Sequence, residues 1–85
     1  MFNISKTTHN MAAKRGIELL IDDNSVAFYK ESDDSEPMFF YSIQDGGLFF
    51  KMNVWLKQEV KQELPCWIKD EKQLKQVIKF LSNEI

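Results

Sequence analysis

Two aromatic, strand-prone runs lie on either side of the tetrapeptide Gln44-Asp45-Gly46-Gly47. An Asp-Gly pair in this setting is the strongest short-range signal for a β-hairpin, because both residues accept the positive φ angles of a tight turn. A second, alternating pair of runs surrounds Asp23-Asn24, which tolerates a turn of the same kind. The sequence therefore predicts four antiparallel strands, over residues 17–22, 25–30, 38–43 and 48–54.

The last part of the chain has the spacing of an amphipathic helix. Its apolar residues recur at i, i+3, i+4, i+7 and i+11, and they are Leu74, Val77, Ile78, Leu81 and Ile85. Asp70 can cap the start of this helix, and Gln73 follows three residues later, as in a capping box. The pattern predicts a C-terminal helix that packs against one face of the sheet.

Two shorter helical segments are also predicted. Leu56, Val60 and Leu64 recur every four residues, which favours a helix over about 55–64 that ends at Pro65, although the same stretch also alternates and could be extended. Within residues 1–15 a short helix is expected to end at Gly16, since glycine suits the left-handed position after a helix. The predicted fold class is α+β, a four-stranded antiparallel β-meander packed against a C-terminal helix.

Size and cysteine usage limit the architecture and the compartment. The 85 residues fit a single domain, 1–85, with a thin core. Cys66 is the only cysteine, so no intramolecular disulfide can form, and no apolar run has the length of a signal peptide or a membrane span. A reducing, cytoplasmic location is expected, with Cys66 a buried or half-buried structural thiol.

Strand pairing predicts that both faces of the sheet are apolar. The core face combines the set Ile17, Leu19, Ile21, Val26, Phe28, Phe39, Tyr41, Ile43, Phe50, Met52 and Val54. The opposite face holds Leu20, Ala27, Tyr29, Met38, Phe40 and Phe49. Because several hundred Å² of apolar surface rarely stays wet, we expect a cover from residues 1–15, the 55–64 segment, a second copy of the chain or another protein.

The sequence offers little for catalysis or metal binding. His9 is the only histidine, and the acidic loop over 31–36 lacks the glycine and distal glutamate of a calcium loop. Glu59-Val60-Lys61 matches the Glu-x-Lys form of some metal-dependent nucleases over three residues only. We predict no enzyme, no cofactor and no metal; a deep pocket lined by Asp22, Asp45 and Glu59 would revive a catalytic interpretation.

These observations favour a small non-enzymatic protein-interaction module of the inhibitor, immunity or accessory type, with a homodimer as one form that it could take. Its partner would be another protein or a second copy of the chain. The predicted partner-binding residues are Tyr29, Met38, Phe40, Phe49, Asp33 and Asp34, with the acidic loop steering encounter.

The alternative is a nucleic-acid-binding module that uses an aromatic and basic face, formed by Phe49, Lys51, Trp55 and Lys57. Residues 17–45 contain eight acids against one lysine, in a chain of net charge −2. A nucleic-acid binder usually carries a basic stripe, so this alternative ranks second. No membrane partner is expected.

Overall fold

The computed structural model describes residues 3–33 and 35–85. Its elements are α1 (Lys6–Lys14), β1 (Ile17–Ile21), β2 (Ser25–Lys30), β3 (Phe39–Gln44), β4 (Gly47–Asn53), α2 (Gln58–Lys61), β5 (Trp67–Ile68) and α3 (Glu71–Glu84). The strands form one antiparallel sheet in the order β1-β2-β3-β4-β5. The predicted α+β meander and its C-terminal helix are confirmed, and the short strand β5 extends the sheet beyond the four predicted strands.

The two hairpin turns are built in different ways. At the β3–β4 turn, Asp45 and Gly46 have φ angles of 50° and 77°, as the Asp-Gly pair predicts. At the β1–β2 turn neither central residue has a positive φ, so the expectation for Asp23-Asn24 is wrong in its mechanism. The carboxylate of Asp22 instead accepts the backbone N–H groups of Asn24 and Ser25, at 3.0 and 2.8 Å.

The helices begin and end where side chains satisfy free backbone groups. Asp70 caps α3 by accepting the backbone N–H of Gln73 at 2.9 Å, and the Gln73 side chain accepts the N–H of Lys69 at 3.0 Å. Helix α1 ends just before Gly16, whose φ is 79°. Helix α2 is one turn within the predicted 55–64 segment, although the three predicted apolar positions of that segment are all buried.

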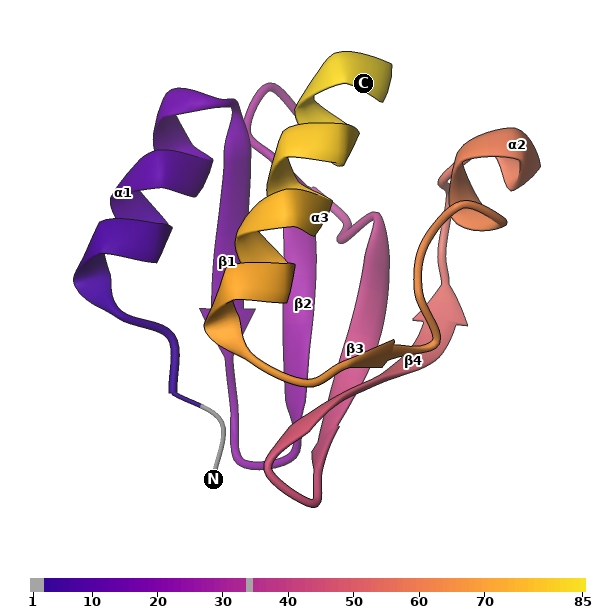
Figure 1. The fold of residues 1–85 in the computed structure, drawn as a ribbon. Helices are drawn as coiled ribbons and strands as arrows, with labels where there is room; N and C mark the ends of the chain where they lie inside the picture. The colour runs from indigo at the N-terminus through magenta and orange to yellow at the C-terminus, as the bar shows by residue number, and fades with distance from the viewer. Residues whose placement is uncertain (1–2, 34) are drawn as a thin grey trace.

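Both long helices lie on the same face of the sheet, α1 beside α3 (Figure 1). Beneath them, Phe28 and Phe39 stack with ring centroids 4.6 Å apart. The 56–65 segment closes the far end of this core: the Tyr41 hydroxyl donates to the Pro65 carbonyl at 2.6 Å, and the Lys61 ammonium lies 5.3 Å from the centre of the Phe50 ring. The core is therefore complete on one side of the sheet, which we call the helix face.

A β-bulge changes which residues of β4 point to the helix face. Tyr41 pairs with Phe50, but Phe40 pairs with Met52, so Lys51 is an extra residue in the ladder. Beyond it the alternation is shifted by one residue. The prediction that Met52 shares the core face is therefore wrong: Met52 lies on the opposite side and is 49% exposed.

Met38 also differs from its predicted position. We expected it on the face opposite the helices, but β3 begins one residue later, and Met38 is fully buried in the core cluster. Its backbone N–H donates to the Phe28 carbonyl at 2.6 Å, and its carbonyl accepts the N–H groups of Val54 and Trp55. Met38 therefore joins three segments from inside the core and cannot contribute to an exposed surface.

Candidate protein-interaction surface

The face of the sheet opposite the helices, called the outer face here, carries an apolar row across four strands. The register pairs Leu20 with Ala27, Ala27 with Phe40, and Phe40 with Met52. The two ends of this row are open, since Leu20 is 51% and Met52 49% exposed, whereas Ala27 at 7% is enclosed between its neighbours. Phe40 is half-buried. The row thus has large side chains at three positions and a small one at Ala27.

An aromatic pair extends the outer face toward β5. Phe49 pairs with Trp67 across the β4–β5 ladder, and their ring centroids lie 4.3 Å apart. Gly47 makes room for this pair, because the position that a Cβ would occupy there is only 2.2 Å from the Trp67 ring. Both rings are half-buried. The two rings therefore hold each other in place at the β5 side of the outer face.

The sequence-predicted partner-binding residues are only partly brought together. Tyr29, Phe40 and Phe49 lie on the outer face and are half-buried, whereas Met38 is in the core. Asp33 is exposed in the connection between β2 and β3, where its carboxylate accepts the Ser35 hydroxyl at 2.9 Å. Asp34 lies outside the described residues.

Two contributors to this surface were missed by sequence reasoning. Met52 reaches the outer face only because of the bulge, and no feature of the sequence marks the bulge. Trp67 belongs to a strand of two residues, which is too short to show a period of two. The Pro65-Cys66 and Lys69-Asp70 pairs that flank this strand indicate an irregular segment instead.

Charge is distributed unequally across the outer face. Glu18 shares the face with Leu20 on β1, and Asp22 follows β1 and accepts the Ser25 hydroxyl at 3.1 Å. Backbone hydrogen bonds from Asn24 and Ser25 lower the pKa of Asp22, and the positive charge of Lys51 lowers it further. The β1 side of the outer face is therefore acidic, and the β4 side carries a cation.

The residues of the alternative nucleic-acid platform do not form one surface. The Phe49 ring contacts the Trp67 ring in a tilted arrangement near the β3–β4 turn, whereas Trp55 follows the other end of β4 and donates its ring N–H to the Glu36 carbonyl at 3.3 Å. Trp55 and Lys57 line a small cavity of about 250 Å³ together with Glu84 and Ile85 of the last helix. Stacking of successive bases needs neighbouring aromatic rings, and Phe49 and Trp55 are separated by the length of a strand.

The three acids of the catalytic interpretation are also apart. Asp22 and Asp45 lie in the two hairpin turns, while Glu59 lies on α2 beyond the end of β4. Within residues 3–33 and 35–85, no three His, Cys, Asp or Glu side chains are grouped so that they could hold a metal ion. Cys66 is exposed, so the expectation of a buried or half-buried thiol is wrong.

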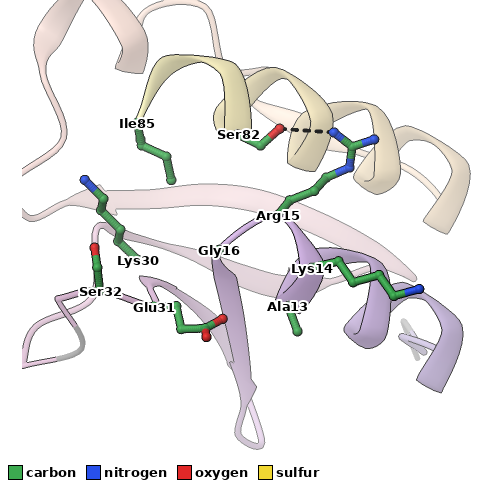
Figure 2. Close-up of a pocket in the computed structure, with 9 residues that line it drawn as sticks. All are labelled: Ala13, Lys14, Arg15, Gly16, Lys30, Glu31, Ser32, Ser82 and Ile85. Carbon is green, nitrogen blue, oxygen red and sulfur yellow. Dashed lines mark hydrogen bonds between the residues drawn. The ribbon is translucent and has the colours of Figure 1, made fainter.

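An open cleft of about 510 Å³ lies where α1 ends beside the end of α3 (Figure 2). It is lined by the basic residues Lys14, Arg15 and Lys30 together with Glu31. Arg15 donates to the Ser82 hydroxyl at 3.3 Å, and the Lys14 and Lys30 side chains point in opposite directions. The cations of this cleft thus do not converge on one position, as an anion site requires.

Throughout the described part of the chain, no helix is both long and apolar enough to span a membrane. Comparison with known proteins finds no family model, curated protein or solved structure that matches this chain. The function of the chain is therefore inferred from its own geometry.

Proposed function

We propose that this chain is a small non-enzymatic protein-interaction module, and that it acts through the outer face of its sheet. One observation carries the proposal: the helices cover the helix face apart from Ile21 on the edge strand β1, yet large apolar side chains at both ends of one row, Leu20 and Met52, remain open on the outer face. Exposed apolar surface in a contiguous row is typical of protein contact sites. Rigid aromatic neighbours such as Phe40 and Phe49 favour the same role, because aromatic anchors lose little conformational entropy on binding.

The test is the size of the native assembly in extracts of cells that express the chain at a high level and are treated with a cross-linker before lysis, so that a weak contact survives dilution. The wild-type chain should elute well above its own 10.0 kDa. Leu20→Glu and Met52→Glu should each shift it to the size of the single chain, because each places an unpaired charge in the apolar contact. Ile21→Glu is the matched control, since Ile21 is 45% exposed on the same strand but on the helix face.

Nuclease treatment separates this proposal from the nucleic-acid alternative. The assembly should survive nuclease, and disassembly by nuclease would assign it to nucleic acid. A wild-type chain that elutes at its own mass in the extract, or an assembly that responds equally to the Ile21 and Leu20 variants, would refute a role for the outer face.

A further inference from the structure

We infer that the occupant of the outer face is a second copy of this chain, packed face to face about a two-fold axis that runs along the strands between β2 and β3. This inference rests on the proposed function and names its partner. It follows from the order of large, small and charged residues across the face. A two-fold interface must be complementary to itself, so the order of residues determines about which two-fold axis two copies of this face can pack.

The apolar row is self-complementary about that axis. Rotation about a line parallel to the strands places β1 over β4 of the other copy, and β2 over β3, at the same height along the strands. Leu20 then meets Met52 of the second copy, and the small side chain of Ala27 meets the ring of Phe40. Large residues thus enter the space that small ones leave, as interdigitating sheet faces require.

An axis across the strands fails on the same criterion. Each strand would then face its own copy, so that Phe40 would meet Phe40 while Ala27 met Ala27, a protrusion against a protrusion and a gap against a gap. The acidic β1 side, with Glu18 and Asp22, would also lie against itself. Like charges brought together across an interface oppose association.

Charge favours the strand-parallel axis for the same reason. It brings the acidic β1 side of one copy over β4 of the other, where the bulge places Lys51 and Met52 next to each other. Within one chain the positive charge of Lys51 contributes to the lowered pKa of Asp22. In the dimer each Lys51 lies between two Asp22 carboxylates.

The dimensions of the outer face give the size of the contact. Strands about 4.8 Å apart and about six residues long give each copy a footprint of roughly 400–500 Å². A dimer would bury about 800–1,000 Å², which is below the range of about 1,200–2,000 Å² for specific, stable complexes. Contacts of this size are typical of weak, transient complexes, so the dimer should be concentration-dependent.

Purified full-length chain, measured by sedimentation equilibrium from about 10 µM to 1 mM, tests the inference. The wild type should move from monomer toward dimer. Leu20→Lys and Met52→Glu should each weaken dimerisation about tenfold or more, since each dimer gains two charges that face an apolar side chain and neighbouring groups of like charge. Ile21→Lys, on the helix face, should leave the equilibrium unchanged.

The double variant tests the axis itself. Within one chain Leu20 and Met52 are three strand spacings apart, about 14 Å, so the new charges cannot pair inside a copy. Between copies the proposed axis brings the new ammonium group at position 20 against the new carboxylate at position 52, and Leu20→Lys/Met52→Glu should dimerise better than either single variant. Dimerisation that is not recovered in the double variant would overturn the geometry.

A wild-type chain that stays monomeric to about 1 mM would overturn the inference of self-association. It would leave the proposed function standing if the native assembly in extracts still depended on Leu20 and Met52. Monomers in both experiments would remove both proposals. The two experiments therefore separate a wrong partner from a wrong surface.

Discussion

Gly47 is the position at which a single methyl group should disturb the candidate surface most. The Cβ of alanine there would lie 2.2 and 2.6 Å from two atoms of the Trp67 ring and 2.7 Å from the Ile68 carbonyl oxygen. Nonbonded carbon atoms prefer about 3.5–4.0 Å, so both the ring and the β5 backbone must retreat by about 1 Å. Overpacking of this kind costs about 1–3 kcal/mol, and displacing the ring from Phe49 adds about 0.5–1.5 kcal/mol.

We therefore expect Gly47→Ala to lower the free energy of unfolding by about 2–4 kcal/mol. For a domain of this size the midpoint of thermal unfolding should fall by about 10–25 °C. Urea titration followed by circular dichroism measures the free energy, and tryptophan fluorescence reports the displacement of Trp67 in the folded state. Gly46→Ala is the matched control, because no atom lies within 4 Å of a Cβ there and only the positive φ opposes the substitution, at about 1 kcal/mol.

The Trp67→Ala background isolates the contact. If the ring is the main obstacle, the cost of Gly47→Ala should fall by at least about 1 kcal/mol in that background, with the Ile68 carbonyl accounting for the remainder. The steric reasoning is refuted if Gly47→Ala costs no more than Gly46→Ala. It is also refuted if the cost is the same with and without the Trp67 ring.

Two further predictions concern the hydrogen bonds that close the helix face. Hydroxyl and backbone N–H groups at the start of α1 donate to Glu71 of α3 and lower its pKa to about 2, so wild-type stability should decline as pH falls from about 4.5 to about 2. Glu71→Gln should make this decline smaller in urea titrations at several pH values, with the remainder due to carboxylates such as Asp22 whose pKa is also lowered. The substitution should cost less than about 1 kcal/mol at pH 7 because the carboxylate is partly exposed. An unchanged decline would show that Glu71 does not cause it. Tyr41→Phe leaves the Pro65 carbonyl without its 2.6 Å donor and should cost about 1–2 kcal/mol by the same assay, and no loss would mean that water replaces the hydroxyl.

The sequence predicts the elements of this fold well because most of their signals are local. The Asp45-Gly46 turn and the Asp70 cap each depend on residues a few positions apart. The contact between α1 and α3 does not, because Ser5 and Glu71 are 66 residues apart and only the folded chain brings them together. A local pattern indicates where a helix begins but not which distant carboxylate it meets.

The candidate surface was harder to predict, since face assignment depends on register along the whole strand. Counting alternate residues from the β3–β4 turn correctly places Phe50 on the same face as Tyr41. The count fails one residue later, at Lys51. Every assignment beyond a bulge is inverted, so the Met52 prediction failed even though the turn was correct. Met38 failed for a related reason, because it precedes the strand whose alternation was applied to it.

The bulge also determines what kind of surface the outer face can be. With strict alternation Met52 would point to the helix face, and the apolar row would end at Phe40. Lys51 would lie on the outer face in either case, and the extra residue brings Met52 to its side, so that the face gains an apolar end opposite Leu20 next to the cation. Met52 is not part of the core cluster, so the bulge shapes the outer face and leaves the core intact.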